Sequence, residues 1–323
     1  MSTIYGSPLL LGGKKPTPLR VSTNGTWSIA GGYSPVTVNI PAYEVTSGTK
    51  VITAEGSYDV TEFKKVRVII GTYVSITPVE GLSYVDGLPN DWNRIKEIAK
   101  IISEASDSIN ANTTGSVYVN NGNTWAYKIT PGNTISVTST AGTYTYAVMG
   151  FNNFALTNQN HYGGNHITAG LTFGAVDSVG KYRMNSSNTN GGGWKNCLMR
   201  TSTMPTLQNG MPHTLAQVKV PYVDYNLQDV IVYSDDYLFL PAEKEVFGTR
   251  TESIAVEADA LTQFAYYKNG GSKIKSVSGN AWWWWLRSAR YNHDDSFCAV
   301  WKSGSAAYND PPNSLGASPC FCV

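Results

Sequence analysis

Charged residues are scarce in this chain. Asp, Glu, Lys and Arg make up 15% of the 323 residues, and 24 basic residues nearly balance 23 acidic ones. No basic run stands out, so the sequence lacks the electrostatic signature of proteins that bind nucleic acid or lie on a membrane surface. We therefore expect neither kind of partner.

Long apolar segments are lacking as well. No segment reaches the ~20 residues that span a bilayer. In the N-terminal stretch MSTIYGSPLLLGGKKP the basic pair follows a short apolar run, which is the reverse of a secretory signal. These features predict synthesis in a cytoplasm without a signal peptide and no insertion into a membrane.

Cysteines are few. Cys197, Cys298, Cys320 and Cys322 are too unevenly spaced for a disulfide framework. One residue separates Cys320 from Cys322, whereas zinc and redox pairs have two, and no His lies near them in the sequence. On a strand the two thiols would share one face. We expect buried, reduced cysteines that act as small hydrophobic residues.

Catalytic and metal-binding motifs are also missing. The sequence has no Ser-His-Asp arrangement, phosphate-binding glycine loop or dinucleotide fingerprint in a supporting context. Acidic residues cluster at Asp235, Asp236, Glu243 and Glu245 and could suggest a carboxylate pair, but a polar turn entering a strand is the favoured explanation. HYGGNH contains two histidines, His161 and His166, without a third ligand, which favours a loop. We expect no enzyme activity, no metal and no cofactor.

The residues that are abundant favour strands and turns. The chain has 31 Gly and 20 Tyr, and Ser, Thr and Asn are common. Its length favours two domains. Residues 1–86 read as short strands, with an Asn-Gly hairpin signal in TNGTW (Thr23 to Trp27) and β-branched runs in VTVNIPAYEV and VRVII. The segment from Ile52 to Ile70 resembles tail-strand modules of phage structural proteins, although any small β-domain would read similarly.

One amphipathic helix is predicted after this β-rich part. Asn90 or Asp91 can cap it, and it is expected to run to about Ile109 because apolar residues recur every three or four positions. These apolar residues are Trp92, Ile95, Ile98, Ile102, Ala105 and Ile109. The domain boundary is expected at about residue 87.

Hairpins and short helices are predicted further along the chain. Asn121-Gly122 and Ala141-Gly142 mark the turns of two hairpins. Short helical pieces are expected over Met204 to Asn209 and His213 to Val218. From Trp282 onward, short strands should alternate with turns.

The stretch NAWWWWLRSARYNHDDSFCAVW, Asn280 to Trp301, contains four consecutive tryptophans and then a run without any pattern. On a strand two indoles would lie on each face, and we expect Trp284 and Trp285 in the core. Period two places Cys298 and Val300 inward and Ala299 and Trp301 outward. Phe297 breaks this alternation, which predicts a bulge or a turn just before it.

Four phrases occur in order in the second part of the chain: AGLTFGAVD, YRMNSSNTNGGGWKNCLMR, YLFLPAEKEVFG, and WWLRS followed by FCAV and GASPCFCV. Together they resemble a C-type-lectin-like family common in bacteria and their phages, related to the sulfatase-modifying-factor fold, over about residues 88–323. The resemblance implies an α+β protein. Its C-terminal C-type-lectin-like (formylglycine-generating-enzyme-like) ligand-binding domain would cover residues 87–323, after a small all-β attachment or assembly domain at 1–86.

Many members of that family look like the variable target proteins of diversity-generating retroelements, in which adenine-directed mutagenic copying rewrites a C-terminal cassette. The resemblance implies a variable region at about 282–318. The residues that match the constant framework are Trp284, Trp285, Leu286, Arg287, Ser288, Phe297, Cys298, Val300, Gly304, Gly316, Pro319 and Phe321. The ligand-binding positions that would vary are Ala289, Arg290, Tyr291, His293, Asp294, Asp295, Ala299, Trp301, Ser303, Ser305, Ala307, Tyr308, Asp310 and Pro311.

The function implied by this resemblance is ligand or receptor binding. We expect a homotrimeric protein of a phage tail or virion surface, made in the bacterial cytoplasm. It would contact a host cell-surface protein or glycan and bind other virion proteins through its N-terminal domain. Aromatic residues and Arg suit such a surface, because they bury much area at low entropic cost. The alternatives are a fold-related protein-modifying enzyme, for which only Cys320 and Cys322 could supply the cysteine pair, and an inert virion decoration or structural protein. The calcium-binding triplets of related sugar-binding proteins are missing.

Overall fold

The computed structural model of the chain describes residues 73–78, 82–121 and 125–323, and before residue 73 it describes only the backbone of six short strands. The predicted TNGTW turn and most of VTVNIPAYEV lie outside the described residues, as does much of the segment from Ile52 to Ile70. The chain forms two compact units. The first contains Met1–Asp86 and Ser116–Ile129, and the second contains Gly87–Gly115 and Thr130–Val323.

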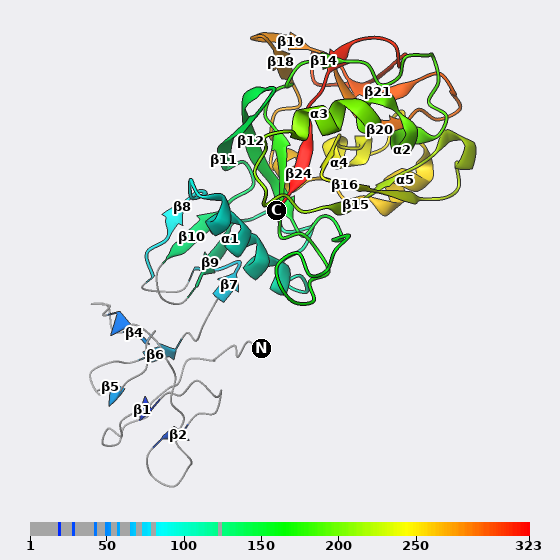
Figure 1. Cartoon of the computed structure of the whole chain (residues 1–323). Coiled ribbons are helices and arrows are strands. Elements are labelled where there is room, and N and C mark those ends of the chain that lie inside the picture. Colours follow the sequence, from blue (N-terminus) through cyan, green and yellow to red (C-terminus); the bar gives the residue numbers. More distant parts are fainter. Residues whose placement is uncertain are drawn as a thin grey trace. The chain divides into compact units, whose positions relative to one another are not determined.

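The regular elements described in the first unit are all strands (Figure 1). The strands described in this unit form three sheets, with the orders β2-β1-β5, β3-β4-β6 and β7-β9-β10-β8. The strands are β1 (Leu19–Arg20), β2 (Ser28–Ile29), β3 (Ala42–Tyr43), β4 (Thr49–Ile52), β5 (Ser57–Tyr58), β6 (Lys65–Val68), β7 (Tyr73–Ser75), β8 (Val85–Asp86), β9 (Val117–Asn120) and β10 (Ala126–Ile129).

The hairpin β9–β10 is the one predicted around Asn121-Gly122, and Gly122 itself is outside the described residues. Its strand β9 pairs with β7 and its strand β10 pairs with β8, so both neighbours come from before residue 87. Val117 and Val119 are fully buried. The chain therefore passes from the first unit to the second near the predicted boundary and then returns to the first unit for one hairpin.

The second unit is a mixture of sheets and short helices, so the chain as a whole is of mixed α and β class. Its larger sheets have the orders β11-β12-β13-β24-β17 and β14-β23-β20-β21-β22, and are called the β12 sheet and the β20 sheet below. The strands are β11 (Thr134–Ser139), β12 (Gly142–Phe151), β13 (Leu171–Ala175), β14 (Lys181–Tyr182), β15 (Val218–Tyr222), β16 (Val232–Asp236), β17 (Leu238–Phe239), β18 (Lys275–Val277), β19 (Asn280–Trp282), β20 (Trp284–Ala289), β21 (Phe297–Val300), β22 (Ala306–Asn309), β23 (Leu315–Gly316) and β24 (Cys320–Cys322). The helices are α1 (Trp92–Glu104), α2 (Gly193–Asn196), the π-helix η1 (Met199–Thr203), α3 (Met204–Gln208), the 3-10 helix η2 (Tyr225–Leu227), α4 (Glu243–Phe247), α5 (Ala255–Ala260) and α6 (Ala265–Lys268).

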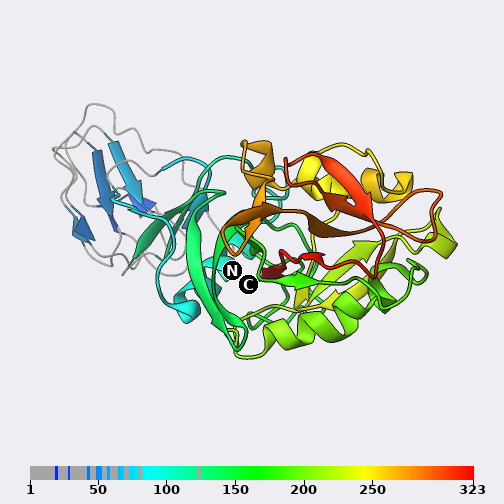
Figure 2. The same cartoon turned by 90° about the horizontal axis from the view of Figure 1, so that it is seen from above.

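The β12 sheet carries the core of this unit. Edge strand β11 alternates exposed Thr and Ser with buried Ile135 and Val137, as expected for a strand with one solvated face. Strand β24 pairs with both β13 and β17, and its Phe321 ring stacks on Phe173 with 5.1 Å between centroids. The C-terminal Val323 is fully buried, and Figures 1 and 2 show this end of the chain in the middle of the unit.

Helix α1 packs on this core as the sequence pattern predicts. Asp91 is the N-cap, and its carboxylate accepts a hydrogen bond from the Asn93 amide at 3.0 Å. The helix ends at Glu104, earlier than expected, because the Asn152 side chain donates to the carbonyls of Ile102 and Ile109 and draws the chain into a turn.

Glycine is required at position 170, where the chain passes directly against helix α1. A Cβ on Gly170 would overlap the backbone carbonyl of Ala99. The close approach therefore fixes how this segment lies against the helix.

Other predicted elements have mixed outcomes. The hairpin β11–β12 with Ala141-Gly142 at its turn is confirmed, and so is the helix at Met204, which is α3. The helix predicted from His213 to Val218 is wrong. The Ala216 amide bonds to the Cys322 carbonyl, and Val218 begins strand β15, so pairing with neighbouring strands overrides local helical preference.

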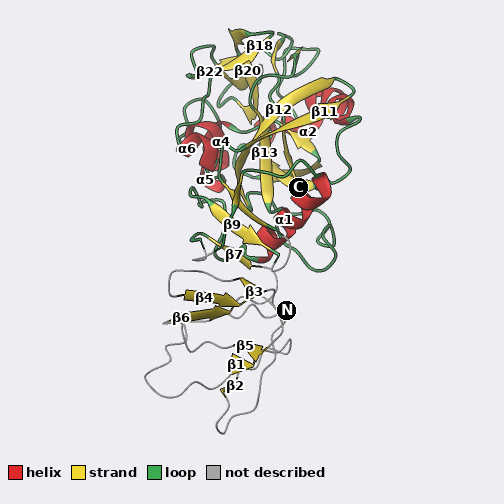
Figure 3. Cartoon of the chain, turned by 90° about the vertical axis from the view of Figure 1, so that its left-hand side faces the viewer, coloured by secondary structure: helices red, strands yellow, loops and turns green. Residues whose placement is uncertain are grey.

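The run of tryptophans divides as expected. Trp284 and Trp285 are fully buried in β20, whereas Trp282 is 38% exposed and Trp283 is half-buried. Every side chain of β20 is buried, so both faces of this strand are covered. Helices α4, α5 and α6 gather on one side of the unit (Figure 3). No helix within the described ranges is long and apolar enough to cross a membrane.

Candidate binding surface

The unpatterned residues after the tryptophans form a loop between two buried strands. Strand β20 ends at Ala289, which pairs with Phe297 at the start of β21, and the pairing is irregular between Trp285 and Ala289. Residues 290–296, called the candidate loop below, connect the two strands. The Arg290 amide donates to the Ser296 carbonyl at 3.1 Å and closes the loop. A turn before Phe297 is therefore confirmed.

Aromatic and cationic side chains are in contact on this loop and beside it. The Arg290 guanidinium lies 3.1 Å from the centroid of the Tyr308 ring, and the His293 ring lies parallel to that ring at 6.5 Å. The Arg250 guanidinium lies 4.9 Å from the Tyr291 ring. Tyr291 and Tyr308 are 44% and 42% exposed, so large parts of both rings remain open to solvent.

Charges of both signs surround these rings. Arg290 forms an ion pair with Glu252 at 3.3 Å, and the His293 and Asp295 side chains approach to 3.8 Å. Asp294 and Asp310 are exposed. The candidate surface is defined here as Arg250, Glu252, Arg290, Tyr291, His293 and Tyr308.

The loop is held to its surroundings through its backbone. Asn190 donates from its side-chain amide to the carbonyls of His293 and Ser296, at 2.6 and 2.7 Å, and from its backbone amide to Asp294 at 2.8 Å. On the other side, the Tyr291 amide donates to the Glu252 carbonyl at 2.9 Å. The loop conformation is thus set by neighbours from distant parts of the sequence.

Not all of the predicted ligand-binding residues gather at this loop. Trp301, Ser303 and Ser305 belong to the turn between β21 and β22, at the other end of β20, where Val300 pairs with Trp284. The Trp301 ring there contacts Trp283 edge-on. The structure therefore separates the predicted residues into two groups, one at each end of the strand pair, with half-buried Ala307 between them.

Three predicted contact residues are buried, which corrects their assignment. Ala289 and Ala299 lie in internal strands of the β20 sheet and are 1% and 0% exposed. The outward orientation predicted for Ala299 from period two is wrong, because both faces of β21 are covered. Pro311 is buried, and its carbonyl accepts hydrogen bonds from the Met184 and Asn185 amides.

Arg250 and Glu252 were missed by sequence reasoning. They lie in the segment between α4 and α5, about forty residues before the candidate loop, and no spacing rule links the two segments. A bridge between Ser253 and Arg290 brings them together. The available sequence signal was their position just after the YLFLPAEKEVFG phrase, which does not indicate a contact.

The acidic residues considered as a catalytic pair form hydrogen bonds and ion pairs within the second unit. Asp236 accepts hydrogen bonds from the Trp194 indole and from Ser234, and pairs with Arg200 at 2.6 Å. Glu243 and Glu245 are buried in helix α4, so the alternative explanation of a polar turn entering a strand is wrong for them.

The remaining candidates for metal or thiol chemistry are also accounted for. His161 and His166 lie in a loop as predicted, on either side of Tyr162, with ring centroids 4.8 and 5.0 Å from it. In the part of the chain that the structure describes, no group of three His, Cys, Asp or Glu residues could hold a metal. All four cysteines are free and buried, as predicted. Burial raises the pKa of the Cys197 and Cys322 thiols to about 12.

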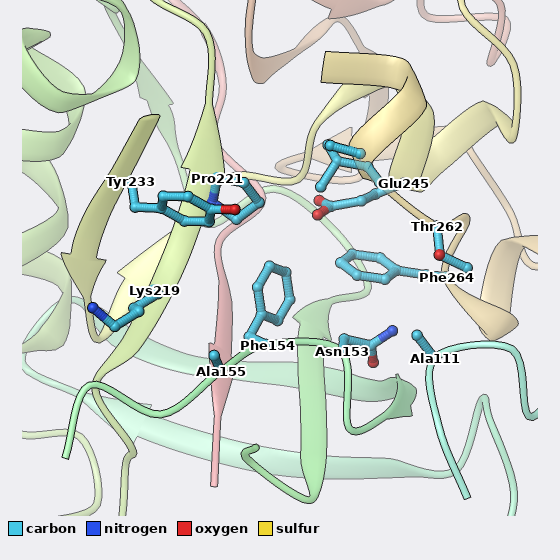
Figure 4. Close-up of a pocket in the computed structure, with 12 residues that line it drawn as sticks. Ala111, Asn153, Phe154, Ala155, Lys219, Pro221, Tyr233, Glu245, Thr262 and Phe264 are labelled. Carbon is cyan, nitrogen blue, oxygen red and sulfur yellow. The ribbon is translucent and has the colours of Figure 1, made fainter. Parts of the chain in front are cut away.

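A pocket of about 200 Å³ lies elsewhere in the second unit (Figure 4). Phe154 and Phe264 line it together with Tyr233, Lys219 and the Glu245 side chain. Both oxygens of that carboxylate are bound by the Arg287 guanidinium at 2.6 and 2.7 Å. The carboxylate in this pocket is therefore committed to an internal ion pair.

Comparison with known proteins gives one match. Residues 167–323, just under half of the chain, match the family model described as "Domain of unknown function (DUF6273)". Searches of curated proteins and of solved structures found no match to this chain. The matched region contains the β20 sheet, the candidate loop and all of the candidate surface.

Proposed function

We propose that this protein binds a ligand noncovalently through the candidate surface. The observation that carries the proposal is the pair of half-exposed tyrosines, Tyr291 on the candidate loop and Tyr308 on the adjacent strand β22, each in contact with an arginine. The backbone of the loop is held from both sides. Rigid aromatic side chains and Arg are the residue types that contribute most to binding energy at protein interfaces. A loop that is already ordered loses little entropy on binding.

The wider role follows from the resemblance of the four phrases. We propose that the second unit is a C-type-lectin-like domain with a diversified surface, that it stands on a phage tail or virion, and that it contacts a host cell-surface protein or glycan. The first unit would attach it to other virion proteins, and a homotrimer would strengthen weak single contacts through multivalency.

The positions of the four phrases support this proposal. AGLTFGAVD forms β13 and pairs with β24 of the last phrase. Asn190 of the second phrase bonds to the candidate loop, and Glu245 of the third pairs with Arg287 of WWLRS. Phrases that are distant in sequence are thus structurally interdependent, which is expected for the constant part of a domain that presents a variable loop.

Sequencing of this gene in a natural population tests the diversified surface. Substitutions should concentrate at Tyr291, His293, Asp294 and Tyr308, whose side chains are accessible, while buried Ala299 stays small. Substitutions spread evenly over the codons for residues 280–323, or none at all, would contradict diversification.

A binding experiment tests the surface directly. The purified, fluorescently labelled chain would be titrated onto whole host bacteria and binding measured by flow cytometry. The double variant Tyr291→Ala, Tyr308→Ala should bind at least roughly tenfold more weakly, because two aromatic contacts are lost. The matched control, Tyr233→Ala with Tyr237→Ala, removes two tyrosines of similar exposure from another part of the unit and should bind normally. Equal loss in both variants would place the binding surface elsewhere.

A further inference from the structure

Asn190 is fully buried, and its side-chain and backbone N–H groups donate hydrogen bonds to the candidate loop. Both hydrogens of its amide are used, one on the His293 carbonyl and the other on the Ser296 carbonyl. Its backbone amide bonds to the Asp294 carbonyl between them. All three acceptors are backbone atoms of the candidate loop, so none of these bonds depends on which side chains the loop carries.

Glu243 has the corresponding arrangement on the opposite side. It is fully buried, and its carboxylate accepts hydrogen bonds from the backbone amides of Thr251, Glu252 and Ser253 at 2.9–3.1 Å and from the Ser253 hydroxyl at 2.7 Å. Charge-assisted bonds of this kind are among the stronger ones in proteins. The ordered segment then accepts the Tyr291 amide on the Glu252 carbonyl.

We propose that Asn190 and Glu243 are positioning residues that fix the shape of the candidate surface from beneath. Asn190 binds the backbone of the candidate loop directly, at residues 293–296. Glu243 binds the backbone of the segment that contains Arg250 and Glu252, and the Glu252 carbonyl of this segment accepts the Tyr291 amide of the loop. Both are fully buried, so neither touches a ligand. This inference rests on the proposed function only for its importance in binding, because the geometry itself involves no ligand.

Amide hydrogen exchange of the full chain tests the proposal. The reporters are the amides of Arg290 and Tyr291, which are hydrogen-bonded within this arrangement. In Asn190→Ala these amides should exchange roughly tenfold to a hundredfold faster, because two buried bonds to the loop are lost. The amides of α1 should keep their rates. The matched control, His293→Ala with Asp294→Ala, removes loop side chains but leaves the carbonyls that Asn190 binds, and should leave the reporter amides unchanged.

Two results would overturn the proposal. One is an unchanged rate at Arg290 and Tyr291 in Asn190→Ala, and the other is equal acceleration in the control variant or throughout α1, which would indicate general destabilisation. If the alanine variant does not fold, Asn190→Ser provides the same comparison, since its hydroxyl retains one donor and should give intermediate rates. Failure of cell binding with the exchange pattern as expected would reject the proposed function and leave the positioning role standing.

Discussion

Arg287 is a fully buried arginine whose charge is paired inside the second unit. Its side chain is fully buried, makes two hydrogen bonds to Glu245, and donates to the carbonyls of Pro221 and Leu240 at 2.9 Å. A buried guanidinium is tolerated only when its charge and its donors are all matched. Its pairing joins strand β20 to helix α4, so one ion pair links two parts of the second unit.

Glu245→Gln should therefore destabilise the protein by about 3–5 kcal/mol, because it leaves the Arg287 charge buried without its counter-charge. Urea denaturation monitored by tryptophan fluorescence measures the change. Glu97→Gln is the matched control: Glu97 pairs with Arg94 at 3.3 Å on the accessible side of α1, and should contribute only about 0–1 kcal/mol. A similar decrease in the free energy of unfolding for both variants would show that the buried pair contributes no more to stability than the surface pair.

Glu257 gives the second prediction at this scale, a dependence of stability on pH. Burial raises the pKa of its carboxyl from 4.5 to about 7, with the nearby Arg287 charge acting in the opposite direction. The folded state keeps this proton up to about pH 7, whereas the unfolded state loses it near pH 4.5. The contribution to the free energy of unfolding is therefore fully present below pH 4.5 and is lost as the pH rises through 7, by about 3 kcal/mol.

Glu257→Gln should remove this part of the pH dependence. Unfolding free energies of the variant and the unmodified chain, measured between pH 5 and pH 8, should differ most at the alkaline end, where the variant is relatively more stable. Glu104→Gln, at an exposed position of α1, serves as the control. A difference that does not change with pH would argue against titration of Glu257.

Secondary structure was predictable where the local pattern agrees with tertiary packing. The periodicity of α1 and the turn glycine of β11–β12 are local signals, and both elements formed. The segment from His213 to Val218 instead follows its pairing with β24 and β16, which no local pattern reveals. The residues of the candidate loop stood out by their lack of pattern and were assigned to binding by the family resemblance. Their contacts with Asn190 and Arg250 were not predicted, because these contacts join residues far apart in sequence.

The sequence left open whether Asn90 or Asp91 is the N-cap of helix α1. The structure selects Asp91 over Asn90, since the Asp91 carboxylate accepts the Asn93 amide. Asp91→Ala should lower the free energy of unfolding by about 1 kcal/mol, as expected for loss of an N-cap. Asn90→Ala should leave it nearly unchanged. The same denaturation experiment measures both, and a larger loss for Asn90→Ala would assign the cap to that residue.

At the scale of the whole molecule, the division into units does not follow a single cut in the chain. The hairpin β9–β10 lies within the sequence of the second unit but pairs with β7 and β8 of the first. Val117 and Val119 lie on β9 of that sheet and are fully buried. A chain cut at the sequence boundary near residue 87 would keep the hairpin and lose both of its neighbours.

Two truncated chains test whether the hairpin β9–β10 belongs to the first unit or to the second. The first contains residues 87–323 unchanged, and the second replaces Ser116–Ile129 by a short Gly-Ser linker. Unpaired strand edges favour association, so the first should oligomerise or aggregate more readily in light scattering. The second should stay dispersed and unfold in one cooperative transition, because its core strands and helices all belong to the second unit. Greater stability and solubility in the first chain would mean that the hairpin belongs to the second unit after all, and that the unit boundary near residue 87 is a simple one.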